Sequence, residues 1–131
     1  MIAANIGVLS GLLVILLVSL VKQLNTSLFY GLMLCGIGFL YVGFTWRDTS
    51  AVFITSVQAI IFLLIAYYAT KKSLPVMALG FFLHGCWDLA YGFFATPGFI
   101  PPHYDIFCLT IDFTIGIYLL FLQQHKLKTS R

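Results

Sequence analysis

Charged residues are scarce in this sequence. Only 8% of its 131 residues are charged, whereas an ordinary globular domain carries about 25%. The hydrophobic fraction of 61% and the mean hydropathy of +1.03 are correspondingly high. A chain this short cannot bury so much apolar side-chain area in one water-soluble core. The composition therefore excludes an ordinary soluble domain and predicts an integral membrane protein.

Two further absences exclude other classes of protein. The three cysteines, Cys35, Cys86 and Cys108, form no C-x-x-C pair, which argues against a thioredoxin-like redox motif and against a zinc knuckle. The basic residues do not gather in a patch suited to nucleic acid, because they fall at the ends of hydrophobic segments or in a short loop. We therefore expect membrane lipids as partners, and no nucleic acid.

Long hydrophobic runs are what the sequence has in abundance. A transmembrane helix needs about 20 mostly apolar residues, and five segments meet this requirement. They are separated by short polar stretches and by a proline-rich stretch over residues 96–103, where a helix cannot continue. We predict an all-α integral membrane bundle of five transmembrane helices, forming a single membrane domain over residues 1–131. The predicted spans are residues 2–21, 28–46, 51–70, 75–95 and 104–124.

The basic residues also predict the orientation of the bundle. With five spans, six of the seven lie on one side of the membrane, and only Arg47 lies on the other. Loops rich in lysine and arginine stay in the cytoplasm. We expect the N-terminus outside and the C-terminus in the cytoplasm. The six residues on the cytoplasmic side are Lys22, Lys71, Lys72, Lys126, Lys128 and Arg131.

Small and aromatic residues have ordinary structural interpretations in such a bundle. Small residues let helix backbones approach closely within lipid, which predicts packing roles for the glycines of the first two spans. Tyrosine and tryptophan near span ends are typical of the membrane interface. The glycines are Gly7, Gly11, Gly31, Gly36, Gly38 and Gly43, and the aromatic residues are Tyr30, Trp46, Tyr67, Tyr68 and Tyr104.

A layer of polar residues crosses three of the predicted spans. Asp88 and Asp112 each lie about 12 Å inside the outer end of a span, at the usual helical rise. Gln58 reaches a similar depth in the third span. A charged group at membrane depth is costly and usually marks a functional site that faces the protein interior. The shared depth therefore predicts that these three residues meet.

Helical spacing extends this layer into a candidate site. His84 and Asp88 are four residues apart and share a helix face, which Tyr91 continues outward. Asp105, Cys108 and Asp112 form a stripe on the last span, the antiparallel neighbour expected of the fourth. If the two stripes face each other, they line a crevice that opens to the outer side. The candidate catalytic residues are His84, Asp88 and Asp112, and the substrate-binding or supporting residues are Gln58, Trp87, Tyr91, Cys108, Asp105 and Arg47.

Three chemistries fit a carboxylate and an imidazole in a medium of low dielectric constant. The groups can act as general acid and base, relay protons in a transporter, or hold zinc or iron. We expect no cofactor. A metal at His84, Asp88 and Asp112 is the disfavoured alternative, because the histidine-rich spacing of a membrane di-iron oxidase is missing.

The run from Leu83 to Asp88, the proline loop, and the run from Cys108 to Asp112 together resemble a known family. Its members are uncharacterised small multi-pass bacterial membrane proteins with an H-x-x-W-D helix, a proline-containing loop and a C-x-x-x-D helix. The resemblance therefore implies a bacterial inner (plasma) membrane protein. By this resemblance His84, Trp87, Asp88, Cys108 and Asp112 are signature positions. Members usually carry a histidine pair after W-D, where this chain has Tyr91 and Gly92. That difference removes two metal ligands, and the family has no established activity.

Three functions stay open from the sequence. The favoured hypothesis is an enzyme that acts on a lipid-like or apolar small molecule by acid–base chemistry, with Asp88 and Asp112 as acid and base and His84 orienting them or sharing a proton. The second hypothesis is a non-catalytic membrane subunit or assembly protein whose polar layer holds helices together. The third is a small proton-coupled transporter, working as a homo-oligomer because five short spans enclose little volume.

Overall fold

The computed structural model describes residues 1–94 and 100–130, which form five α-helices and no strand. Each helix is long and apolar enough to cross a membrane, as the sequence predicts. The residues not described, 95–99 and 131, include the predicted end of the fourth span and much of the proline-rich stretch. The helices are α1 (Ile2–Leu20), α2 (Thr26–Thr45), α3 (Thr49–Lys72), α4 (Leu74–Phe94) and α5 (Tyr104–Thr129).

Local capping explains where several helices begin. The side chain of Asn25 accepts a hydrogen bond of 3.0 Å from the Leu28 amide at the start of α2. Asp48 caps α3 in the same way, with 2.9 Å to the Ala51 amide. These bonds satisfy amides that have no partner inside the helix. Because Asp48 caps α3, the helix begins two residues before the predicted span.

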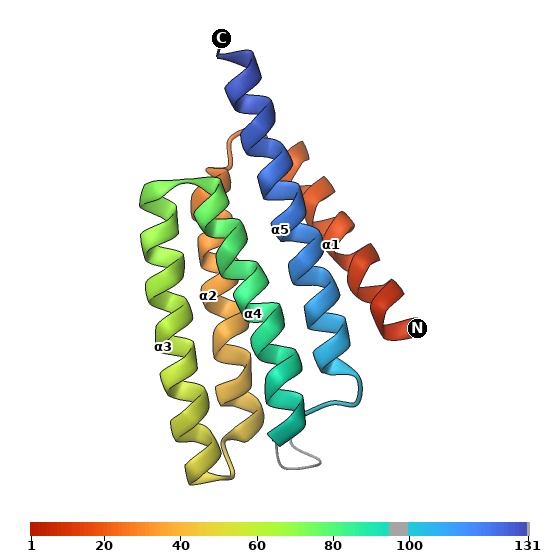
Figure 1. Ribbon diagram of the computed structural model, residues 1–131, viewed down its shortest axis with the longest axis vertical. Coiled ribbons are helices and arrows are strands. Elements are labelled where there is room, and N and C mark those ends of the chain that lie inside the picture. The colour runs from red at the N-terminus through yellow and green to blue at the C-terminus, as the bar shows by residue number, and fades with distance from the viewer. Residues whose placement is uncertain (95–99, 131) are drawn as a thin grey trace.

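The helices form an open arrangement with α4 near its centre (Figure 1). Helix α4 packs against α5, α3 and α2, and α2 packs against α3. Helix α1 lies at one side of the bundle, where it packs against α5, and α3 lies at the opposite side. The predicted antiparallel pairing of the fourth and fifth spans is therefore present, and it is an extensive contact.

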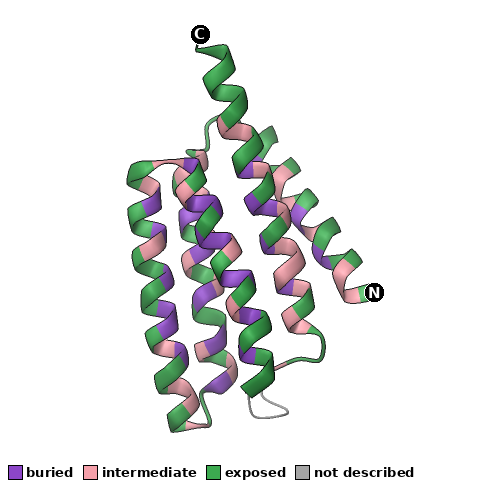
Figure 2. Ribbon diagram, viewed as in Figure 1, coloured by how far each residue is buried: buried purple, intermediate pink, exposed green. Residues whose placement is uncertain are grey.

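Burial is concentrated on the faces that α2, α3 and α4 turn toward one another (Figure 2). The core includes Tyr30, Leu34, Met77 and Phe81, all completely buried. Most of α1 is exposed within the chain, as expected for a helix whose other faces contact lipid. The α1–α2 link, the α3–α4 link and the end of α5 share one end of the bundle (Figure 1), so the lysines gather there.

Not every glycine and aromatic residue has the role that the sequence predicts. Gly31 and Gly38 pack against α3, whereas Gly36 and Gly43 have no neighbour within 4 Å of an added Cβ. Tyr67, Tyr68 and Trp46 are exposed near helix ends, as interfacial residues are. Tyr30 is fully buried among Phe29, Phe81 and Tyr118, so its predicted interfacial position is wrong. Proximity to a helix end does not determine which face a residue occupies.

Candidate functional site

The central feature of the site is His84, which α4 directs into the bundle. Its helix buries one continuous stripe of side chains at three- and four-residue intervals, and His84 lies in the middle of that stripe. This spacing keeps residues on one face of a helix. The stripe contains Met77, Phe81, His84, Asp88 and Tyr91.

Two carboxylates converge on one nitrogen of His84. The Nδ1 atom lies 2.8 Å from Oδ2 of Asp112 and 3.2 Å from Oδ2 of Asp88. The three side chains are 1%, 1% and 0% exposed. The structure thus brings together His84, Asp88 and Asp112, which we call the triad. Only the Asp112 contact has hydrogen-bond geometry, with Nδ1–H donating when the carboxylate is ionised.

Close packing of α4 against α5 makes this convergence possible. Asp112 belongs to a buried stripe on α5 that also includes Cys108, Ile115 and Leu119. Gly85, next to His84, permits the approach: a Cβ there would lie 3.3 Å from the Cα of Leu109 on α5. A larger residue would push the two backbones apart. The pair of stripes predicted from the sequence therefore does face inward.

Aromatic side chains cover the triad on the side nearer the start of α5. Tyr41 of α2 is completely buried and packs edge-on against Tyr91 and Tyr104, with ring centroids 5.1 and 5.9 Å apart. Tyr41 and Cys108 are also neighbours of the Asp88 carboxylate. The sequence predicts a crevice that opens outward at this point. The triad is instead closed off, because these rings occupy the space above it.

Several buried polar atoms around the triad have no hydrogen-bond partner within the described chain. They are His84 Nε2, both carboxylate oxygens of Asp88, the Tyr41 hydroxyl and the Trp87 indole nitrogen. A polar group that lacks a hydrogen bond inside a membrane protein raises the free energy of the fold by roughly several kcal/mol, because no water is there to take the place of the missing hydrogen-bond partner. The Tyr41 hydroxyl adjoins the Asp88 carboxylate and can donate to it, so His84 Nε2 is the triad atom without a neighbouring partner.

The net charge of the triad is the next feature of the site. Two carboxylates and one imidazolium would carry one uncompensated negative charge in a site that is at most 1% exposed. Burying an unbalanced charge is costly. A neutral triad requires one further proton or a bound cation.

The triad also has the composition of a small metal site. His84, Asp88 and Asp112 each offer a ligand atom, and these atoms lie within 4.8 Å of one another. Imidazole nitrogen and carboxylate oxygen suit zinc or iron. A cation at Nδ1 would have to replace the hydrogen bond to Asp112, whereas Nε2 is already free. The donor set thus fits a metal, without requiring one.

Other predicted site residues lie outside the triad. Gln58 is buried in α3; with its amide group reversed, its nitrogen donates to the Gly38 and Thr55 carbonyls at 3.1 and 3.2 Å. Asp105 lies half-buried beside Gly92 at the start of α5. Arg47 is exposed and lies over the ring of Trp46, 5.1 Å from its centroid. Arg47 therefore lies between α2 and α3, stacked on the adjacent Trp46.

Three residues next to the triad are missing from the sequence prediction. Phe62 packs edge-on against the His84 imidazole, with centroids 4.7 Å apart. Tyr41 and Tyr104 form the aromatic cover described above. A usable signal exists for two of them: Phe62 lies four residues after Gln58, and Tyr104 lies four before Cys108. Nothing in the uniformly apolar second span singles out Tyr41.

Comparison with known families identifies one that the chain matches. Residues 2–125 match the model of a family described as a family of unknown function (DUF6010). The chain belongs to this family. The match agrees with the resemblance to an uncharacterised family, and five apolar helices fit a membrane protein. No curated protein and no solved structure matches the chain. Membership in DUF6010 therefore brings no activity with it, and the functional argument depends on the triad.

Proposed function

We propose that this protein is a membrane enzyme that transfers protons to and from an apolar or lipid-like small molecule at the triad. One observation carries the proposal: His84 is held through Nδ1 by a buried carboxylate, while Nε2 has no partner. A histidine oriented in this way by a carboxylate is the usual device for presenting the other ring nitrogen as a general base.

The three residues would have different roles in this chemistry. Asp112 accepts a hydrogen bond from Nδ1–H, which leaves the lone pair on Nε2 and keeps the imidazole in one orientation. Nε2 lies on the far edge of the ring, so it faces away from Asp112. Asp88, next to the same imidazole, would hold the further proton that charge balance requires, so that proton uptake at Nε2 brings the buried site to neutrality. The sequence-based roles are thus modified, with His84 as the proton-transferring group.

The same proposal includes a location and an orientation. The resemblance to small bacterial membrane proteins supports an inner-membrane location, and the positive-inside rule supports the lysine-bearing end in the cytoplasm and the N-terminus outside. The triad would then lie within the outer half of the membrane. Asp112 follows the first residue of α5 by eight positions, or about 12 Å of helix. An apolar substrate would reach this depth from the bilayer.

A role in helix packing is the second candidate, because the nearly complete burial of the triad also favours it. In that case Asp112 and His84 join α5 to α4 and perform no reaction. The two candidates differ in one measurable respect. A packing role makes function follow stability, whereas catalysis lets a folded variant be inactive.

The test measures proton transfer without knowledge of the substrate. Purified protein in nanodiscs is incubated in D₂O with a membrane lipid extract, and mass spectrometry searches for deuterated or newly formed lipids. We expect such species with the wild-type protein and none with His84→Gln. Asp48→Asn is the matched control, since it neutralises a half-buried carboxylate outside the site and asparagine can still cap α3. Species that persist in folded His84→Gln protein would contradict the proposal.

A further inference from the structure

A row of protonatable side chains follows α5 from its first residue to the triad. Tyr104, Cys108 and Asp112 lie at four-residue intervals, which places them on one side of the helix and about 6 Å apart along its axis. Tyr104 is half-buried, whereas Cys108 is 5% exposed and Asp112 is 1% exposed. The row therefore connects one end of the bundle with its buried interior.

The contacts of this row also cross from α5 to α4. The Cys108 thiol adjoins the Tyr104 hydroxyl and the Asp88 carboxylate. A thiol and a phenol each donate and accept hydrogen bonds, so each can take up a proton while it passes on its own. The same carboxylate lies 3.2 Å from Nδ1 of His84. The row thus reaches the imidazole of the triad through Asp88.

No comparable row leads from the triad toward the lysine-bearing end within the described residues. On that side the buried stripes of α4 and α5 continue with completely buried apolar side chains, which are Phe81, Met77, Ile115 and Leu119. Tyr30 packs against Phe81 there, but its buried hydroxyl has no partner among the described residues. The protonatable contacts of the triad therefore lead toward the start of α5.

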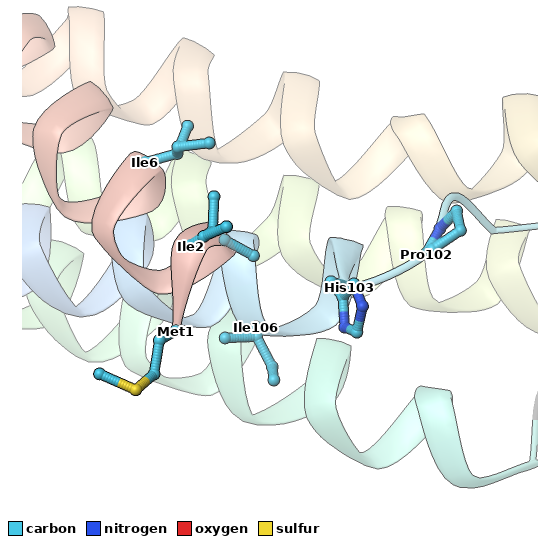
Figure 3. Close-up of a pocket in the computed structure, with 7 residues that line it drawn as sticks. Met1, Ile2, Ile6, Pro102, His103 and Ile106 are labelled. Atoms are coloured by element: carbon cyan, nitrogen blue, oxygen red, sulfur yellow. The ribbon is translucent and has the colours of Figure 1, made fainter.

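The start of α5 is accessible from outside the bundle. His103 is exposed and Asp105 is half-buried, so titratable groups flank Tyr104 on both sides in the sequence. A groove of about 570 Å³ between α1 and the start of α5 borders this end (Figure 3). Among the described residues that line the groove, His103 carries the only titratable side chain. The groove therefore offers no second row of groups that leads inward.

We propose that the Asp88 carboxyl group exchanges its proton with water at the start of α5, through Cys108 and Tyr104. In uptake, the Tyr104 oxygen takes a proton from hydronium, the Tyr104 proton moves to Cys108, and the Cys108 proton moves to Asp88. Tyr104 and Cys108 end neutral, the carboxylate becomes a carboxylic acid, and release runs in reverse. That this exchange resets the triad between turnovers rests on the proposed function, whereas the exchange itself does not.

This route fits the closed structure of the site. The rings of Tyr41 and Tyr104 occupy the space beside the triad, with centroids 5.9 Å apart, and leave it at most 1% exposed. A proton can pass along hydroxyl and thiol groups without any molecule moving through this layer. The aromatic cover thus excludes water and substrate on this side but not protons.

The test measures how fast the triad exchanges hydrogen for deuterium in the absence of any substrate. Protein in nanodiscs is switched from H₂O to D₂O buffer, and infrared spectroscopy follows the C=O band of the protonated carboxyl group, identified by its loss in Asp88→Asn. We expect Cys108→Val to slow exchange at least about tenfold, since a positioned proton-transfer group contributes about 10²–10⁴-fold in enzymes. Cys108→Ser should stay near the wild-type rate, because its hydroxyl also donates and accepts.

Two tyrosine variants complete the test. Tyr104→Phe removes one oxygen atom from a half-buried side chain and should also slow exchange at least about tenfold. Tyr30→Phe is the matched control: it removes a buried hydroxyl on the other side of the triad and should leave the rate unchanged. Wild-type rates in both Cys108→Val and Tyr104→Phe would overturn the inference. Equal slowing by Cys108→Val and Cys108→Ser would overturn it too, because it would indicate a packing role.

The outcome is separable from that of the proposed function. Slowed exchange in Cys108→Val and Tyr104→Phe, without deuterium transfer to any lipid by the wild-type protein, would refute the proposed function alone. Wild-type transfer together with unchanged exchange in both variants would refute this inference alone.

Discussion

Replacing Asp112 with asparagine separates catalysis from packing at the triad. Asparagine has nearly the same shape, and its side-chain oxygen can still accept a hydrogen bond from Nδ1 across the present 2.8 Å. What it removes is the negative charge, and its amide group can also turn and donate to Nδ1. In that second orientation the proton moves to Nε2, and the ring can no longer act as a base there.

The two consequences differ greatly in size. Side-chain hydrogen bonds between membrane helices contribute about 0.6 kcal/mol on average and about 1.7 kcal/mol at most. We therefore expect Asp112→Asn to lower the free energy of unfolding by roughly 1 kcal/mol. Loss of the correct tautomer in a carboxylate–histidine pair reduces turnover by about 10⁴-fold in the best-studied enzymes. We expect a reduction of about 10³- to 10⁴-fold here.

Both quantities can be measured on one preparation. Titration with SDS in mixed micelles gives the free energy of unfolding, and deuterium uptake by the lipid extract gives the rate. The reasoning is refuted if Asp112→Asn remains folded and keeps more than a tenth of the wild-type rate. It is equally refuted if the rate falls only in proportion to the folded fraction.

Three further predictions concern packing and topology. Gly85→Ala should lower the free energy of unfolding by about 1–3 kcal/mol in the SDS titration, because the added Cβ meets the backbone of α5. Gly36→Ala is the control: it has open space around it and should be neutral or slightly stabilising in the same titration. Thr45→Val removes a buried hydroxyl pair 2.9 Å long between α2 and α3; it should cost about 0.6 kcal/mol and leave deuterium transfer unchanged. In a cysteine-free background, Ser50→Cys should react with an impermeant maleimide added outside cells, whereas Ser130→Cys should react only after the cells are lysed. The reverse pattern would contradict the proposed orientation.

The sequence predicts the helices well because the signal for them is local. Five hydrophobic runs with polar breaks determine the number of helices, and most observed ends lie within two residues of the predicted ones. The main difference is α5, which continues to Thr129 although the predicted span ends at residue 124. Hydrophobicity predicts only the membrane-crossing part. Lysine and leucine, which make up three of the five residues beyond the predicted span, favour helix, so α5 continues past it.

The candidate site is only partly predictable from sequence, because its details depend on how each helix is rotated. His84 and Asp88 share a face by spacing, and Asp112 shares their depth, so their meeting follows from the sequence. The position of Tyr41 does not follow, since a helix that is apolar all round gives no indication of its inward face. The same difficulty explains why the sequence does not predict that aromatic rings close off the triad. The closure depends on Tyr41, Tyr91 and Tyr104, which belong to three different helices.

The packing of α1 against α5 has a consequence for biosynthesis. Gly7 and Gly11 fit against Thr110 and Thr114, so the first helix made finds its main partner in the last. More than 80 residues separate the end of α1 from the start of α5. At a synthesis rate of about 5–20 residues per second, α1 waits roughly 4–17 s before α5 is made. During that interval its glycine face lacks a native neighbour, and the membrane insertion machinery or lipid must cover it.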